Sequence, residues 1–301
     1  MTQHVIVGKG AVGSTLAQEL VAQGSDVLVV SRSGGTDADG IHHVALDATD
    51  ASALTAALRG ADVLYNCANP TYWRWATDWP PLFASMLDAA ARTGAVLVTA
   101  GNLYGYGTHG TMFEDTPLRA TESKGAVRAQ MWRDAAARTD VQATEVRAAD
   151  YFGPLADSQA HAGPRFLRPL VAGKVVRTVV AVDRPHSWTY LPDFARALVA
   201  AGATRDAWGR AWHVPTAEPL TFLELGDRFA SAAGAPTPRI RPLGSGVVRA
   251  MGLVSPLMRE VATVADHFTE PFVMDTSASD RILGTGATPW DLAIKETLAA
   301  V

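Results

Sequence analysis

The segment Val5-Ile6-Val7-Gly8-Lys9-Gly10-Ala11-Val12-Gly13 decides the fold of this chain. It contains the pattern Gly-x-Gly-x-x-Gly between a strand-length apolar run and a helix-like stretch, Ser14–Gln23. In that setting Gly8 allows a tight turn, Gly10 lets the backbone approach a diphosphate, and Gly13 lets helix and strand pack closely. The helix N-terminus adds unpaired N–H groups and a positive dipole. The segment, with Ala11 and Val12 at its helical end, therefore predicts a dinucleotide-binding loop; a Gly-rich turn without ligand is the alternative.

The rest of the first half alternates β-type runs with Ala- and Leu-rich helical stretches. The expected strands are His4–Val7, Asp26–Val30, His42–Ala45, Val63–Cys67, Val96–Ala100 and Ala143–Arg147. The helical stretches between them are Ser14–Gln23, Ala51–Arg59, Pro81–Thr93 and Lys124–Arg138. Strands that are apolar on both faces and alternate with helices are typical of a doubly wound parallel sheet. We therefore expect an α/β, Rossmann-type domain over residues 1–152, with a cofactor crevice at the carboxyl ends of the strands.

The pattern loosens after residue 150. A Pro- and Gly-bearing stretch leads to an apolar run, and helices and one short strand follow it. In chain order these pieces are 153–169, 174–182, 192–201, 211–214, 221–233, 247–265 and a closing helix from residue 289. We expect elements at about 174–214 to return to the Rossmann domain. Residues 153–173 and 215–301 are then expected to form a smaller C-terminal substrate domain.

Composition restricts the kinds of partner. The chain of 301 residues is 48% hydrophobic, has a net charge of -4, and scatters its Lys and Arg residues, so no nucleic-acid footprint is expected. No segment approaches the ~20 apolar residues of a membrane helix. Cys67 is the one cysteine, which fits a reducing, cytoplasmic setting. No Cys/His spacing matches a zinc site, and no metal is expected.

The end of the second expected strand indicates which dinucleotide binds. An NAD-specific site places an acidic residue there to bind the ribose 2′-hydroxyl, but this chain has Ser31-Arg32-Ser33. The Arg32 guanidinium could pair with a 2′-phosphate, and Lys9 could add a second positive charge. We therefore predict NADP(H) in preference to NAD(H), the alternative being that Arg32 is only a solvated surface residue.

The order of further motifs resembles that of the extended short-chain dehydrogenase/reductases, which include sugar-nucleotide epimerases and dehydratases. The resemblance rests on Leu46-Asp47-Ala48, Asn66-Cys67-Ala68-Asn69, Thr99-Ala100-Gly101-Asn102-Leu103-Tyr104-Gly105, Ser123-Lys124 and Arg147-Ala148-Ala149-Asp150-Tyr151-Phe152-Gly153-Pro154. It implies that Asp47 contacts the adenine and that Lys124 holds the nicotinamide ribose. It also implies that the cofactor is lined by Ala48, Cys67, Ala68, Asn69, Thr99 and Tyr151.

Two departures from the family pattern indicate a non-standard active site. Ala120 stands four residues before Lys124, where the family has the Tyr of Tyr-x-x-x-Lys, and Ala100 stands at the catalytic Ser/Thr position. The family's Tyr mechanism is therefore not carried over. Lys124 is the first catalytic candidate, since its charge favours a developing oxyanion. The further catalytic candidates are Tyr104, Thr99, Asn102 and Tyr151.

Large aromatic side chains and one histidine are candidates for substrate binding. Trp73 and Trp75 follow the fourth expected strand, and such rings could stack on a planar or apolar substrate. Tyr106 and His186 could reach the same cleft. The alternatives are a loop pinned by its own tryptophans and a structural histidine.

Together these features predict an enzyme, an NADPH-dependent oxidoreductase that transfers hydride to a small organic carbonyl or conjugated substrate. A nucleotide-sugar epimerase or dehydratase, weakened by the missing Tyr, is one alternative. A non-catalytic NADP(H)-sensing protein is another. The resemblance also implies that two copies could pair through the helices expected at 81–93 and 124–138.

Overall fold

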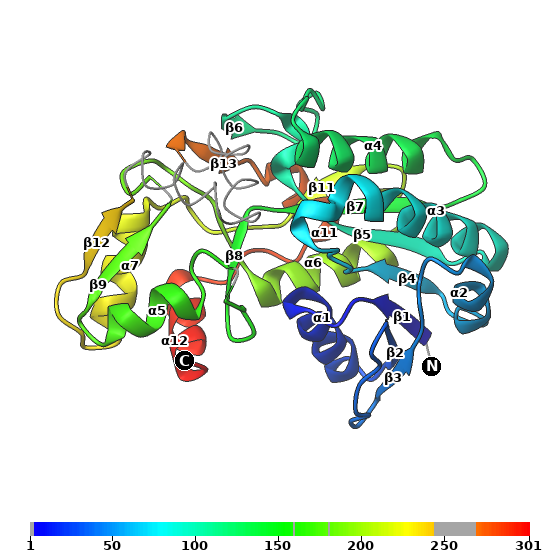
Figure 1. The fold of residues 1–301 in the computed structure, drawn as a ribbon, viewed down its shortest axis with the longest axis horizontal. Helices are drawn as coiled ribbons and strands as arrows, with labels where there is room; N and C mark the ends of the chain where they lie inside the picture. Colours follow the sequence, from blue (N-terminus) through cyan, green and yellow to red (C-terminus); the bar gives the residue numbers. More distant parts are fainter. Residues whose placement is uncertain (1–2, 159, 180, 244–268) are drawn as a thin grey trace.

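The computed structural model describes residues 3–158, 160–179, 181–243 and 269–301, and its centre is a seven-stranded parallel sheet (Figure 1). The strand order is β11-β7-β5-β4-β1-β2-β3. The chain thus winds outward from β1 in both directions, which confirms the expected α/β, Rossmann-type fold. The helix expected at 247–265 lies outside the described residues.

The sheet strands coincide closely with the apolar runs of the sequence. They are β1 (Gln3–Val7), β2 (Asp26–Ser31), β3 (Ile41–Ala45), β4 (Val63–Asn66), β5 (Val96–Asn102), β7 (Ala143–Ala148) and β11 (Ala211–His213). Alternation within β1 shows why these runs are apolar throughout. Ile6 packs into the hydrophobic cluster on one face, and Val5 and Val7 pack into the cluster on the other. Each strand therefore needs apolar side chains in both directions.

Helices cover both faces of the sheet (Figure 1). The helices α1 (Ala11–Ala22) and α6 (Leu191–Ala203) contribute to the cluster that contains Ile6. The opposite face is covered by α2 (Ala51–Ala57), α3 (Trp75–Thr93) and α4 (Ser123–Ala137). This doubly covered sheet places the carboxyl ends of β1, β4 and β5 at one edge, above the start of α1.

A third hydrophobic cluster lies beside the sheet, on the left in Figure 1. Its large members include Phe152, Phe166, Trp188, Phe229 and Trp290. They come from short elements far apart in the chain: β8 (Asp150–Phe152), α5 (Pro164–Val171), β9 (Val175–Thr178), β10 (Trp188–Tyr190), α7 (Phe222–Ala232), β12 (Arg239–Pro242) and α12 (Trp290–Ala299). β9 pairs with β12, and β8 pairs with β10.

The remaining elements connect the two regions. β6 (Gly110–Met112) pairs with β13 (Phe272–Met274), so a late segment returns to the sheet side. α11 (Ser277–Leu283) follows it, and the single-turn segments are η1 (Tyr72–Arg74), η2 (Leu103–Tyr106) and η3 (Arg205–Ala207).

Helix α3 begins at Trp75, six residues before the expected start, although Pro80 and Pro81 lie inside it. Trp75 and Trp79, one turn apart, are both buried and pack edge to face with ring centroids 6.2 Å apart. The burial of two indole rings supplies ample hydrophobic stabilisation for this turn. It outweighs the backbone hydrogen bonds that the prolines cannot make.

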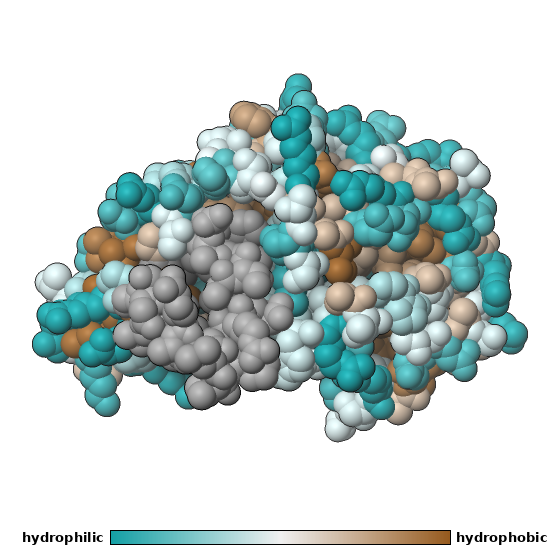
Figure 2. Space-filling view, turned by 45° about the horizontal axis from the view of Figure 1, so that its top comes forward, coloured by the Kyte–Doolittle hydropathy of each residue, from teal (hydrophilic) through white to brown (hydrophobic). Residues whose placement is uncertain are grey.

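The surface is mixed in character. Figure 2 shows hydrophilic side chains spread over the visible face, with hydrophobic ones mainly in recesses between them. The most exposed large apolar side chain among the described residues is Trp73, at 52%. Within the described part of the chain, no helix has both the length and the apolar character needed to cross a membrane.

Candidate functional site

The glycine loop has the geometry that its sequence predicts. Gly8 has a φ of +113°, and a Cβ there would lie 2.4 Å from the carbonyl oxygen of Cys67. A Cβ on Gly13 would lie 2.0 Å from the carbonyl oxygen of Gly8. Around Gly10, by contrast, no atom lies within 4 Å of an added Cβ, and Gly10 caps α1 without a side-chain hydrogen bond. Gly8 and Gly13 are therefore required by packing, whereas Gly10 leaves open space in front of the helix N-terminus.

This open space belongs to a cavity of about 860 Å³ at the carboxyl ends of the sheet strands. Sequence-predicted cofactor residues line it: Gly10, Ala11, Val12, Arg32, Cys67, Ala68 and Asn69. So do the predicted catalytic and substrate residues Asn102, Tyr104, Tyr151, Trp73 and Trp75. The structure thus brings most of the predicted site together around one hollow, although Trp75 is also almost fully buried in the core.

Positive charges lie near the end of β2. Arg32 lines the cavity, and the ammonium of Lys9 donates a hydrogen bond to the carbonyl oxygen of Gly34 at 2.5 Å. The Ser31 hydroxyl donates to the same oxygen at 3.1 Å. Asp47 is exposed and does not line the cavity, and its carboxylate accepts hydrogen bonds from Thr49 that lower its pKa. Ala48, next to it, is buried in the core rather than lining the cavity.

Four of the predicted catalytic and substrate-binding residues lie outside the lining of the cavity. Thr99 is buried in β5, while Ala100 lines the cavity beside it. The expectation for Tyr106 is corrected, because its hydroxyl lies 2.7 Å from Nε2 of His213 in the core. His186 and Lys124 are also buried.

Lys124 lies behind an aromatic layer. Its ammonium is 4.9 Å from the ring centroid of Tyr72 and 5.9 Å from that of Trp75. Both rings present negative faces to the charge. Glu122 caps α4 by accepting hydrogen bonds from the backbone N–H groups of Lys124 and Gly125, which fixes the start of the helix.

Tyr104 lines the cavity beside this layer, with its ring centroid 6.5 Å from that of Trp75. Burial raises its pKa well above the usual range, and a hydrogen bond with Tyr72 adds to the effect. The phenol therefore stays protonated at neutral pH and can donate a hydrogen bond to a substrate oxygen. The Asn102 side chain accepts a hydrogen bond from the backbone N–H of Tyr104 at 3.2 Å, which fixes the turn that carries it.

Arg128 is a cavity-lining residue that the sequence analysis missed. It is buried, and its guanidinium lies 4.7 Å from the ring centroids of both Trp75 and Trp79. One nitrogen donates to the carbonyl oxygen of Ala100 at 3.5 Å, and Nε has no hydrogen-bond partner among the described residues. Burial lowers the pKa of Arg128 to about 10, so the group remains charged at neutral pH. Its position one turn after Lys124 was a usable signal.

A carboxylate and two imidazoles lie at the β8 end of the cavity. Asp150 lines the cavity and accepts a hydrogen bond from Nε2 of the buried His186 at 2.9 Å. His161 also lines the cavity, and burial lowers its pKa. The sequence offered one signal for this group, since Asp150 stands where the Arg-x-x-Asn-x-Tyr-Gly-Pro motif of the extended short-chain dehydrogenase/reductases has Asn.

Two arginines line another part of the cavity, near the third hydrophobic cluster. They are Arg165 of α5 and Arg177 of β9.

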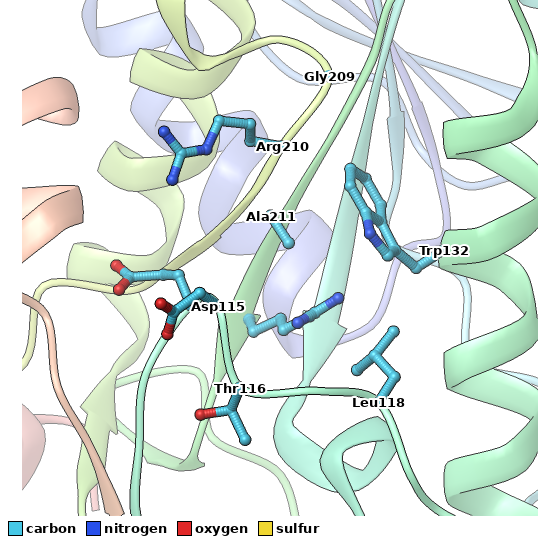
Figure 3. Close-up of a pocket in the computed structure, with 9 residues that line it drawn as sticks. Asp115, Thr116, Leu118, Trp132, Gly209, Arg210 and Ala211 are labelled. Carbon is cyan, nitrogen blue, oxygen red and sulfur yellow. The ribbon is translucent and has the colours of Figure 1, made fainter.

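A second, smaller cavity of about 290 Å³ lies near the β11 edge of the sheet. Figure 3 shows Trp132 on one side of it, with Arg210 and Asp115 on the other. Arg147 also lines it, but its guanidinium donates two hydrogen bonds, at 2.9 and 2.7 Å, to the buried Glu145 carboxylate. That charge is already paired. Among the residues that the structure describes, this cavity also lacks an open helix N-terminus like the one at Gly10 in the larger cavity. No group of three or more metal-ligating side chains occurs among the described residues.

Comparisons with known proteins agree with this geometry. The model of the NAD dependent epimerase/dehydratase family matches residues 5–214. A search of curated protein sequences finds no match. Among solved structures, MoeE5 in complex with UDP-glucose and NAD is 19% identical, with a TM-score of 0.77 over 99% of this chain and 98% of that one.

Two further solved structures are similar over nearly their whole length. UDP-glucose 4-epimerase from Thermotoga maritima, with UDP-glucose, is 15% identical, with a TM-score of 0.78 over 99% of this chain and 98% of that one. A double mutant of the dTDP-glucose 4,6-dehydratase DesIV from Streptomyces venezuelae, with NAD, is 19% identical, with a TM-score of 0.78 over 100% and 96%. At these identities the likeness concerns the fold.

Proposed function

Because the chain belongs to the NAD-dependent epimerase/dehydratase family, we propose that it binds a nicotinamide dinucleotide in the large cavity and acts on a nucleotide sugar. The reaction is an epimerase- or dehydratase-type cycle, in which a carbinol is oxidised and the cofactor is restored. One observation carries this proposal: a single cavity contains both Gly10 of the phosphate loop and Arg165 and Arg177 at its far part. Family membership favours this function over reduction of a small carbonyl compound.

The residues present fit a dinucleotide. The space in front of Gly10 is open, and the α1 N-terminus has no side-chain cap, so its N–H groups are available to a diphosphate. Cys67, Ala68 and Ala100 are small side chains along the cavity at the ends of β4 and β5. They leave room for a flat ring. When bound, the nicotinamide supplies the hydride acceptor and donor, and this chain's residues position the substrate against it.

The proposal includes a preference for NADP(H). Arg32 lines the cavity, Lys9 reaches the loop after β2, and the end of β2 has no carboxylate to bind a 2′-hydroxyl. Two cations at this place favour the extra phosphate.

The far part of the cavity supports a diphosphate-bearing substrate. Arg165 lies in the first turn of α5, whose N-cap residue Gly163 makes no side-chain hydrogen bond. Arg177 comes from the neighbouring strand β9. Guanidinium groups bind phosphate oxygens in bidentate geometry, so two of them suit a nucleoside diphosphate. In this proposal, residues 153–173 and 215–301 form the substrate side, and Trp73 and Tyr72 flank the sugar.

A second candidate function rests on Tyr104. Its buried phenol stays protonated and suits hydrogen-bond donation to a carbonyl oxygen rather than deprotonation of a hydroxyl. That property favours net NADPH-dependent reduction of a carbonyl substrate.

The test is a screen of UDP- and dTDP-linked hexoses with NAD+ or NADP+ present in catalytic amount, with products followed by NMR. The proposal predicts an epimerised or dehydrated sugar without net change in nicotinamide absorbance. Net oxidation of NADPH by simple carbonyl compounds, with no sugar product, would instead establish the reductase function. Binding of the dinucleotide without any turnover would favour a sensor.

A further inference from the structure

The most unusual group in the large cavity is the Asp150 carboxylate. Asp150 begins β8, which pairs in parallel with β10 so that Asp150 lies opposite Trp188. This pairing brings the segment before β10 alongside, and Nε2 of His186 lies 2.9 Å from one Asp150 carboxylate oxygen. The cavity therefore contains a carboxylate that is held by a histidine.

His186 is fixed on every side, which makes it a rigid support. Its backbone exchanges two hydrogen bonds with Leu220, at 3.2 and 3.0 Å. Its ring centroid is 4.6 Å from that of Trp188 and 5.3 Å from that of Phe272. Only 4% of its side chain is exposed, against 20% for Asp150, so the carboxylate rather than the imidazole is accessible from the cavity.

The other titratable groups around Asp150 come from several elements. His161 interacts electrostatically with both Asp150 and His186, and burial keeps it neutral by lowering its pKa. The electrostatic interaction with Asp150 contributes to raising the pKa values of Tyr104 in η2 and Tyr151 in β8. Arg128 and Asp157 face these two tyrosines. The Asp150 carboxylate thus lies among protonated tyrosine hydroxyls and a neutral imidazole.

We propose that Asp150 is the proton-transferring residue of this active site, oriented by His186, in place of the Tyr that the chain lacks at position 120. The inference rests on the proposed function. In the oxidation step the substrate O–H bond breaks and its proton passes to the Asp150 carboxylate. A bound oxidised dinucleotide would accept the hydride as the C–H bond on the same carbon breaks and the C=O bond forms. In the reverse step the proton returns to the substrate oxygen and the hydride to the substrate carbon.

The geometry allows both roles at once. A carboxylate has two oxygens with several lone pairs, so it can accept from His186 and from a substrate hydroxyl together. His186 donates through Nε2–H and does not touch the substrate, so it is a positioning residue.

The test compares the native chain with Asp150→Asn and with the control Asp227→Asn, an exposed residue of α7 that does not line the cavity. UDP-glucose with NADP+ is the probe. A proton-transfer role predicts that Asp150→Asn lowers kcat by ~10²–10⁴-fold and removes the acid limb of the pH profile. The dinucleotide Kd should stay within about threefold of native, and His186→Gln should lower kcat less. The control should match native in every measurement.

A second readout does not depend on turnover. The hydrogen-bonded imidazole proton of His186 should give a downfield NMR signal that Asp150→Asn removes and Asp227→Asn keeps. A native kcat in Asp150→Asn, or a downfield signal that survives it, overturns the inference and leaves the proposed function intact. Failure of the native chain to bind a dinucleotide or convert UDP-glucose and the other sugars overturns the proposed function, and the inference with it.

Discussion

The Tyr106 hydroxyl lies 2.7 Å from Nε2 of His213, and both side chains are completely buried. On the other side of the imidazole, Nδ1 lies 2.6 Å from the carbonyl oxygen of Asp275. A carbonyl can only accept, so Nδ1 carries the proton and the Tyr106 hydroxyl donates to Nε2. The pair joins η2, β11 and the segment after β13, and it is a structural contact outside the cavity.

Tyr106→Phe tests this structural role. The substitution keeps the ring but leaves Nε2 of His213 buried without a donor. We expect the free energy of unfolding to fall by ~1–3 kcal/mol. Urea denaturation measures it, and the dinucleotide Kd of the folded variant should be unchanged. Weakened cofactor binding with native stability would instead show that Tyr106 belongs to the functional site.

Buried histidines make stability sensitive to acid. Burial lowers the pKa of His4, His161 and His213 in the folded chain, whereas their unfolded value is about 6.5. Below that pH the unfolded chain binds protons that the folded chain does not, so their contribution is complete above about pH 6.5 and is lost as pH falls further. Urea denaturation at steps from pH 8 to pH 5 should show a declining free energy of unfolding. A flat profile would contradict the assignment.

Two glycines of the same loop should respond differently to alanine. A Cβ on Gly13 meets the Gly8 carbonyl oxygen at 2.0 Å, so Gly13→Ala should destabilise the fold by ~1–3 kcal/mol. Gly10→Ala meets no protein atom and should cost at most ~1 kcal/mol through helix capping. It should nevertheless weaken dinucleotide binding about tenfold or more, because the methyl group occupies the diphosphate space. Equal effects of both variants on binding and stability would contradict this division of roles.

Arg128→Met separates a ligand-binding role from a structural one. The guanidinium is buried without a carboxylate hydrogen-bond partner among the described residues, so its removal should leave the free energy of unfolding unchanged or raise it by ~1 kcal/mol. Turnover of a nucleotide sugar should fall, since the charge beside Ala100 would no longer stabilise a developing oxyanion. Thermal denaturation and kcat measure the two effects. A large loss of stability with native kcat would identify Arg128 as structural.

The local part of the fold was predictable, because β1, the glycine loop and α1 are adjacent in sequence and each has its own pattern. Strands β9 and β12 were not recognised as a pair, since each has four residues and they meet across 60 residues of chain. The part of the cavity lining at the glycine loop and at the ends of β2, β4 and β5 was predicted from strand ends. Arg128 and His161 were missed because a helix face and a loop show their neighbours only after folding. Tyr106 was misplaced because the turn after β5 takes the chain from the cavity-lining Tyr104 into the core, where the Tyr106 hydroxyl meets His213.

Titration of NADPH and NADH onto the native chain and Arg32→Ala, followed by calorimetry, tests the central claim most directly. The account predicts that the native chain binds a nicotinamide dinucleotide, that NADPH binds more tightly, and that Arg32→Ala abolishes this preference while keeping NADH affinity. Failure of both nucleotides to bind the folded native chain would contradict the account.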